Sequence, residues 1–336
     1  MSELVILNTD QNFSEDWSAA TRPLLILLTS IICLTGFLGN SIVLYGSLLY
    51  NALRLEKISR ALVQSIALCD ALASLLLYLP VLITLVAEQW VLGKAVCFVV
   101  AHSNYMLVLN EIWLVLVMSA YRIWVLKKPK GQRMSVKSVW VVAGIQLALS
   151  VALLIYSVSM KIPAEYRSIS CDTNIYYDKE KYGGYLTIVI LIIPLLCIVL
   201  LNAVLLLSVC LTNKKSNRSI NTVRKPTIML SLVTLIELVS LVPVVYMIMI
   251  SHTDPTNLWL FQNIGWFRIF AVYMVSLNVC SNPLIYLTTN NSFKNYIMGV
   301  LRCRRAVKNN SVVSREFKST TVKTKSTTVF QHRLST

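Results

Sequence analysis

Seven long apolar segments constrain the fold of this chain more than any other feature. A membrane-spanning helix needs about 20 mostly apolar residues to cross a hydrocarbon core roughly 30 Å thick. Soluble helices of such length keep a polar face, which most of these segments lack. The sequence therefore predicts an all-α membrane protein, a seven-transmembrane helix bundle. The predicted spans are residues 23–50, 59–87, 95–126, 135–159, 185–212, 225–251 and 263–288.

The composition agrees with a membrane location. Hydrophobic residues make up 56% of the chain and charged residues only 14%, whereas a soluble domain has about 25% charged residues. The net charge of +16 could suggest a nucleic-acid partner, but the distribution of the charge excludes that interpretation. When the seven spans are threaded, 24 of the 31 Lys and Arg residues fall on one side of the membrane.

This asymmetry predicts the orientation, because basic residues in short loops stay in the cytoplasm. Ten of the 15 Asp and Glu residues lie on the other side. We expect a multi-pass plasma-membrane protein with four parts, and attraction of its basic side to anionic lipid. The four expected parts are an extracellular tail (1–22), a transmembrane domain (23–288), a short amphipathic helix along the membrane (289–305) and a disordered cytoplasmic tail (306–336).

Four residues at or beyond the ends of the spans suggest three covalent modifications. Cys97 and Cys171 lie on the outer, oxidising side, so we expect a disulfide that ties the outer loop over the end of the bundle. Asn12 begins a glycosylation sequon in the outer tail. Cys303 lies in the basic stretch after the last span, where palmitoylation and a free thiol are both open.

Short motifs occur in register in successive spans, and together they are specific. They are Gly36-Phe37-Leu38-Gly39-Asn40, Leu68-Cys69-Asp70, Arg122 with Pro129, Trp140, Pro194, Pro243 and Asn282-Pro283-Leu284-Ile285-Tyr286. Over residues 23–305 the chain resembles the rhodopsin-like (class A) G-protein-coupled receptors. The resemblance implies a receptor rather than an enzyme, with an extracellular ligand and a heterotrimeric G protein as partners. Phosphorylation of the Ser- and Thr-rich tail would recruit arrestin as a further partner.

The resemblance also implies an activation and sodium pocket inside the bundle. Its residues are Asn40, Asp70, Glu111, Glu237, Asn278, Asn282, Pro283 and Tyr286. Asp70 matches the sodium-binding aspartate of the family, and Glu111 stands where the family usually has a serine. Two neighbouring carboxylates either share a proton or hold a cation, so Asp70 and Glu111 are candidate ligands of an allosteric sodium ion. The alternative is a protonated carboxyl hydrogen-bonded to Asn40 or Asn282.

The G-protein-coupling residues implied by the resemblance are Arg122, Pro129 and Asn202, but the pattern departs from the family around them. Tyr121 replaces the acid that restrains the arginine in the resting state, and Asn202 replaces a tyrosine. In the sixth predicted span, Glu237 and Leu241 stand where the family has aromatic residues. We therefore expect altered basal activity. A non-signalling scavenger receptor is a second possibility.

Nine residues are expected to line the ligand cavity: Asn104, Tyr105, Val108, Tyr177, Val244, Ile248, Arg268, Val272 and Ser276. Asn104 stands where amine receptors carry an aspartate, which disfavours an amine ligand. The loop after Cys171 is polar and rich in tyrosine, which favours a peptide, for example a neuropeptide. A small non-amine ligand is the alternative. An ion-coupled secondary transporter is disfavoured because we find no internal repeats.

Overall fold

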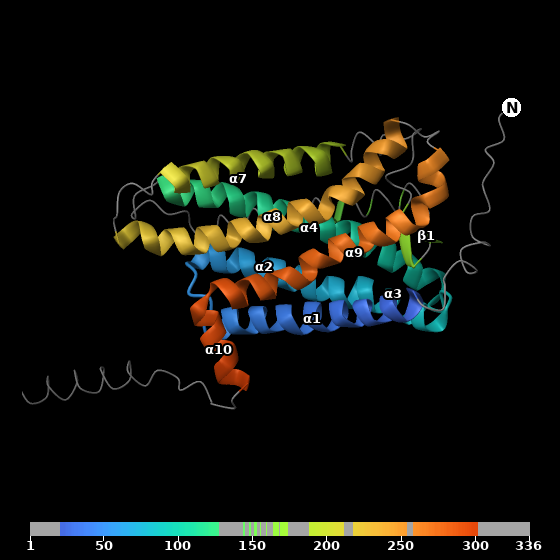
Figure 1. The fold of residues 1–336 in the computed structure, drawn as a ribbon, viewed down its shortest axis with the longest axis horizontal. Helices are drawn as coiled ribbons and strands as arrows, with labels where there is room; N and C mark the ends of the chain where they lie inside the picture. Colours follow the sequence, from blue (N-terminus) through green and yellow to red (C-terminus); the bar gives the residue numbers. More distant parts are fainter. Residues whose placement is uncertain are drawn as a thin grey trace, which may run out of the picture.

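The computed structural model describes residues 21–127, 164–167, 169–173, 188–211, 218–253 and 258–301, with six isolated positions between 144 and 159. The described part is almost entirely helical (Figure 1). Its elements are α1 (Thr21–Leu49), α2 (Lys57–Ala73), the π-helical turn η1 (Ser74–Tyr78), α3 (Leu79–Ala87), α4 (Gly93–Lys127), β1 (Ala164–Arg167), β2 (Ser170–Thr173), the π-helical turn η3 (Ile188–Ile192), α7 (Ile193–Leu211), α8 (Arg218–Thr253), α9 (Leu258–Thr289) and α10 (Asn291–Leu301).

Six helices in the described residues are long and apolar enough to cross a membrane. They coincide with six of the seven predicted spans, and α2, η1 and α3 together form the second. The fourth predicted span, 135–159, lies outside the described residues except for isolated helical positions. In Figure 1 the long helices run side by side, with α10 at one end and β1 at the other.

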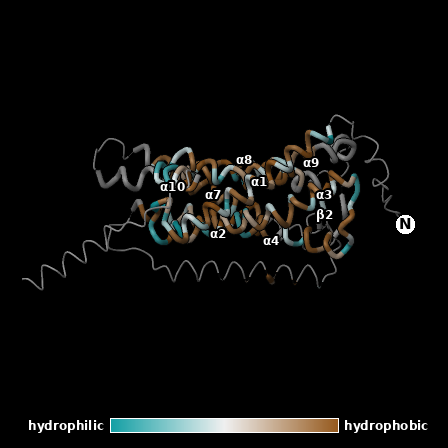
Figure 2. Tube along the Cα trace, turned by 90° about the horizontal axis from the view of Figure 1, so that it is seen from below, coloured by the Kyte–Doolittle hydropathy of each residue, from teal (hydrophilic) through white to brown (hydrophobic). Residues whose placement is uncertain are grey.

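The outer surface of the bundle is apolar and its interior is partly polar. Large side chains such as Leu34, Leu200 and Leu207 are exposed, whereas Asn40, Asp70, Glu237, Asn278 and Asn282 are buried. Figure 2 shows hydrophobic colour along the middle of the bundle and hydrophilic colour near its two ends. This inverted distribution is expected of a protein whose solvent is lipid.

Two of the helices contain a π turn just before a proline. Pro80 follows η1, and Pro194 follows η3. Proline has no backbone N–H and its ring collides with the carbonyl four residues earlier. A wider turn accommodates the ring without ending the helix.

One face of α1 is packed so closely that a β-carbon on any of three glycines would crowd a neighbouring side chain. A β-carbon on Gly39 would lie 2.9 Å from Cγ of Pro283, and one on Gly46 would lie 2.8 Å from Cε1 of Tyr296. At Gly36 it would overlap the hydroxyl of Ser74. These three positions bring α1 against the second span, α9 and α10.

The α9–α10 junction is fastened to the loop before α2 by Asn290. Its Oδ1 accepts a hydrogen bond from the backbone N–H of Phe293 (3.1 Å), which caps α10. Its Nδ2 donates to the carbonyl of Leu53 (2.9 Å). Phe293 is buried and meets the ring of Tyr286 edge-on at 6.5 Å. The predicted short helix after the last span is therefore present.

Candidate functional site

Two acid–amide pairs lie at the centre of the bundle. Nδ2 of Asn282 on α9 donates to Oδ2 of Asp70 on α2 (2.8 Å). One turn earlier on α9, Nδ2 of Asn278 donates to Oε1 of Glu111 on α4 (2.6 Å). The predicted pocket residues from the second, third and seventh spans therefore do meet.

Several buried oxygens around these pairs have no hydrogen-bond donor among the described residues. They are Oδ1 of Asp70, Oδ1 of Asn278, Oδ1 of Asn282 and both carboxyl oxygens of Glu237. Glu237, on α8, is only 2% exposed. A buried carboxyl oxygen without a partner is costly, so the cluster favours a bound proton or a cation.

The donor set suits an alkali cation better than a transition metal. Carboxylate and amide oxygens are the ligands that hard cations prefer. Within the described part of the chain, no three His, Cys, Asp or Glu side chains are arranged to hold a metal ion. Two carboxyls and two amide oxygens fit the weaker coordination of a monovalent ion.

Asn40 does not hydrogen-bond the carboxyls in this structure. Its Nδ2 donates to the carbonyls of Gly36 (2.9 Å) and Val279 (2.8 Å) instead. Asn40 therefore joins α1 to α9. Of the two amide partners proposed for a buried carboxyl, only Asn282 is in contact with Asp70.

Arg122 lies near the end of the bundle at which α10 is found, called here the Arg122 end. The side chain is 3% exposed, and its Nε and Nη2 have no hydrogen-bond partner in the described part of the chain. Nearby on α7, Nδ2 of Asn202 donates to Oγ of Ser119 on α4 (3.0 Å). Thus the asparagine that replaces a tyrosine ties α7 to α4.

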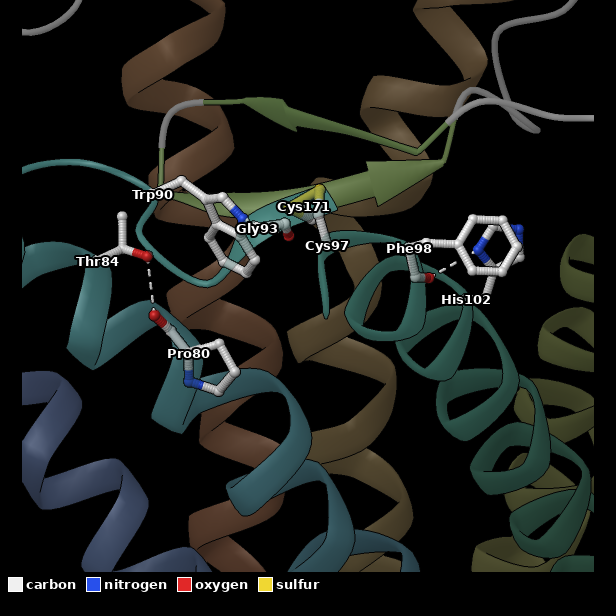
Figure 3. Close-up of a disulfide and its surroundings, with 8 residues drawn as sticks. All are labelled: Pro80, Thr84, Trp90, Gly93, Cys97, Phe98, His102 and Cys171. Carbon is white, nitrogen blue, oxygen red and sulfur yellow. Dashed lines mark hydrogen bonds between the residues drawn. A yellow bond between two sulfur atoms is a disulfide. The ribbon is translucent and has the colours of Figure 1, made fainter. Parts of the chain in front are cut away.

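The opposite end, called the Cys97 end, is fastened by the predicted disulfide. Cys97 in the first turns of α4 is bonded to Cys171 in β2, with a Cα–Cα distance of 5.3 Å (Figure 3). β2 pairs antiparallel with β1, and Tyr166 lies opposite Cys171. Trp90 lies beside the disulfide and donates from Nε1 to the carbonyl of Gly93 (3.0 Å). The disulfide prediction is confirmed, whereas the hairpin was not predicted.

Six predicted ligand residues have described side chains on three helices towards the Cys97 end. Asn104 and Val108 are half-buried on α4, and Val244 is half-buried on α8. On α9, Arg268 is buried and Val272 half-buried. Ser276 is fully buried, and its hydroxyl donates to the carbonyl of Tyr273 (2.6 Å). The Ser276 hydroxyl therefore bonds within its own helix, and the side chain is buried inside the bundle in this structure.

The remaining predicted site residues are only partly described or not described. Tyr105 and Ile248 lie in α4 and α8, but their side chains are outside the described part. Asn12, Pro129, Tyr177 and Cys303 lie wholly outside the described residues.

Sequence reasoning missed the small hydroxyl residues that complete these contacts. Ser119 accepts from Asn202, and Ser74 donates to the Asp70 carbonyl (2.8 Å) and packs against Gly36. One signal was available: Ser74 follows Asp70 by four residues, a spacing at which a helical serine can donate to the backbone carbonyl one turn earlier. For Ser119 no local pattern names a partner 83 residues away.

Comparisons with known proteins agree with this geometry. The profile of the 7 transmembrane receptor (rhodopsin family) matches residues 39–286. Somatostatin receptor type 2 of Sus scrofa is 24% identical over 312 residues, which cover 88% of this chain and 81% of the relative. Proteinase-activated receptor 2 of Homo sapiens is 23% identical and covers 84% of this chain and 73% of the relative.

A solved structure shares the fold. The crystal structure of squid rhodopsin superposes with a TM-score of 0.71, covering 88% of this chain and 91% of the other at 16% identity. The matched profile spans well over half of the chain and includes Asp70, Glu111, Arg122, Asn282 and Tyr286. The chain is therefore a multi-pass membrane receptor rather than an enzyme, and it belongs to the rhodopsin family of seven-transmembrane receptors.

Proposed function

We propose that this receptor lies in the plasma membrane with its amino terminus outside, binds a peptide and activates a heterotrimeric G protein. The observation that carries the proposal is Arg122. Its guanidinium is buried at one end of α4, with two nitrogens that have no hydrogen-bond partner among the described residues. Guanidinium groups remain charged at all physiological pH values and favour carbonyl or carboxylate acceptors. A G-protein segment that enters between α4, α7 and α8 would supply such acceptors.

An Arg122→Ala variant tests the coupling. We expect loss of nucleotide exchange on purified heterotrimeric G proteins, with normal surface expression. Lys57→Ala is the matched control, because Lys57 is an exposed cation at the same end. Full exchange by the Arg122→Ala variant would refute the assignment. A correctly folded wild-type receptor that internalises its ligand but drives no exchange with any G-protein class would instead favour a scavenger.

A peptide ligand is supported by the relatives and by the outer surface. The names of two relatives refer to somatostatin and to activation by a proteinase. The Cys97–Cys171 disulfide holds a hairpin against α4 at the Cys97 end, where an extended peptide could add contacts. A screen of peptides that includes somatostatin, with a second-messenger readout, identifies the ligand. Activation by a small non-amine molecule alone would favour the alternative ligand class.

Arg268 is proposed to pair with a carboxylate of the ligand. For matched peptides that end in a free acid or an amide, the wild-type receptor should bind the acid about tenfold more tightly, the effect of roughly 1.4 kcal/mol. An Arg268→Ala variant should lose this preference. Lys94→Ala, which removes an exposed cation at the same end, should retain it. Equal binding of both peptides by the wild type would exclude the pairing.

The central cluster is proposed as an allosteric sodium site. Asp70 and Glu111 would supply negative charge, and the amide oxygens of Asn278 and Asn282 would complete the shell. The unpartnered oxygens of Asp70, Asn278 and Asn282 support the proposal. A transporter function would show instead as uptake of substrate by proteoliposomes.

Three further roles complete the proposal on the cytoplasmic side. The basic Ser- and Thr-rich tail would recruit arrestin once phosphorylated. Basic side chains would attract anionic lipid. Cys303 would carry a palmitoyl chain that holds α10 at the membrane. The tail and Cys303 lie outside the described residues.

A further inference from the structure

The buried polar atoms that lack partners differ in kind between the middle of the bundle and the Arg122 end. In the central cluster they are acceptor oxygens, such as Oδ1 of Asp70 and both carboxyl oxygens of Glu237. At the Arg122 end they include donors from three side chains: Nε and Nη2 of Arg122, Oγ of Ser59 and Oη of Tyr286. A buried donor without an acceptor is costly, as is the reverse. These donors therefore point to a ligand that accepts hydrogen bonds.

The three donor side chains lie in the end turns of three different helices. Ser59 is in the first turn of α2, Tyr286 is in the last turn of α9, and Arg122 is within the last two turns of α4. Arg122 is 3% exposed, Tyr286 1% and Ser59 0%. The helices α2 and α8 each pack against both α4 and α9. The three side chains therefore occupy the same end of the bundle interior.

Neighbouring groups in the described part of the chain do not supply the missing acceptors. The amide oxygens of Asn51 and Asn202, also at this end, have no hydrogen-bond donor themselves. Glu56 lies within electrostatic range of the guanidinium. That attraction does not satisfy Nε or Nη2, because a hydrogen bond needs an acceptor within about 3.2 Å. The N–H groups of Arg122 thus require an acceptor from outside these side chains.

A small monovalent anion has the chemistry that these groups require. The guanidinium of Arg122 keeps its charge in a protein, and hydrogen bonds from a charged donor to an anion are strong. Water would satisfy the hydroxyls of Ser59 and Tyr286, but it would leave the guanidinium without a counter-charge in the apolar interior. The low exposure of all three side chains favours a small ion over a lipid phosphate. Chloride is such an ion.

We propose that a chloride ion binds to Arg122 in the resting receptor, with Ser59 and Tyr286 as further hydrogen-bond donors. The ion would balance the guanidinium and join α2, α4 and α9. A G-protein segment that offers acceptors to Arg122 would displace it. The displacement rests on the proposed G-protein coupling, whereas the binding of the ion does not.

Thermal unfolding of the full-length receptor in detergent tests the ion without any G protein. Gluconate replaces chloride at constant sodium concentration and ionic strength, so occupancy of the proposed sodium site does not change. The wild type should unfold at a higher temperature in chloride, because a ligand that binds only the folded state stabilises it. Arg122→Gln should lose this difference. Lys57→Gln, which removes an exposed cation at the same end, should keep it.

Three results of this experiment would overturn the proposal. The first is an equal unfolding temperature of the wild type in the two salts. The second is a full chloride effect in Arg122→Gln, and the third is loss of the effect in Lys57→Gln, since either result would place the ion away from Arg122.

The two hydroxyls test the position of the ion. Tyr286→Phe and Ser59→Ala each remove one hydrogen bond and leave the guanidinium in place. Each should raise the chloride concentration that gives half of the stabilisation about tenfold, the effect of roughly 1.4 kcal/mol. Thr288→Ala is the control, because the Thr288 hydroxyl is exposed and bonds to carbonyls of its own helix. An unchanged concentration in both test variants would overturn the proposal, also where Arg122→Gln does not fold.

Nucleotide exchange tests the displacement. At a chloride concentration roughly ten times the half-saturating value, half-maximal exchange should need about tenfold more G protein than in gluconate, because the two ligands compete for Arg122. Exchange by the G protein alone is measured in both salts and subtracted. An equal requirement for G protein in the two salts would overturn the displacement. A receptor that drives no exchange in either salt would refute the proposed coupling, and the thermal results would still decide the ion site.

Discussion

At the scale of single residues, the receptor concentrates its polar chemistry where lipid cannot reach. Asp70 and Glu111 each accept a hydrogen bond from an asparagine on α9. Such a bond to a charged group contributes about 1.5–3 kcal/mol, and leaving the acceptor unpaired costs more. The choice of Asp70, Asn278 and Asn282 as pocket residues followed from the family pattern and is consistent with these contacts. The hydrogen bonds of Asn40 to two carbonyls could not be foreseen, because an amide can satisfy either kind of acceptor and packing decides between them.

Sodium should stabilise the folded receptor through these residues. Replacing choline by sodium at constant ionic strength should raise the unfolding temperature. At a sodium concentration roughly ten times the dissociation constant, the free energy of unfolding should increase by about 1.4 kcal/mol. Asp70→Asn should abolish the difference, since a carboxylate ligand is lost, and Glu111→Gln should reduce it. Glu88→Gln is the control, because Glu88 pairs with Arg22 on the surface. Identical unfolding temperatures in the two salts would rule the cation site out.

At the scale of elements, hydropathy located the spans because each one must bury its own backbone hydrogen bonds in lipid. The six described spans agree with prediction to within a few residues at most of their ends, although α8 begins seven residues earlier, at Arg218. The β1–β2 hairpin was not foreseen, because each strand has only 4 residues, which is too short for an alternating pattern to stand out. The π turns η1 and η3 were not foreseen either. The sequence gives the positions of the prolines, but it does not show how the backbone adjusts to them.

Close helix packing predicts a sharp difference between two glycines. Gly36→Ala should destabilise the receptor by about 1–3 kcal/mol, because the added carbon meets Ser74 and Val279. Gly299→Ala in α10 meets nothing within 4 Å, and alanine is the better helix former, so its stability should be equal or higher. Thermal unfolding of the two purified variants measures the difference. Equal effects would show that α1 can move away from its neighbours.

At the scale of the whole molecule, the apolar circumference and the polar ends define how the bundle sits in a bilayer (Figure 2). The disulfide marks one end, and Arg122 with α10 marks the other. Disulfides persist outside the cell, and basic residues collect inside. Both rules predict that the Cys97 end faces the exterior. Reading charge and cysteine positions together therefore predicts orientation before any motif is considered.

The glycosylation pattern tests this orientation. Asn12→Gln should lower the apparent mass of the receptor from cells, because Asn12 would lose its glycan, and glycosidase treatment should then have no further effect. Asn309→Gln, which removes a sequon at the other end of the chain, should leave the mass unchanged. An antibody to an amino-terminal tag should bind intact cells. Binding only after permeabilisation would reverse the assigned orientation.

The glycine face of α1 bears on how inherited variants of this receptor should be interpreted. Every amino-acid replacement of a glycine adds at least a β-carbon, and at Gly36, Gly39 and Gly46 that atom comes within 3.0 Å of a neighbouring helix or ring. A missense change at any of the three should therefore reduce the amount of receptor that reaches the cell surface. Carriers would show a loss of receptor number with normal properties in each surviving molecule.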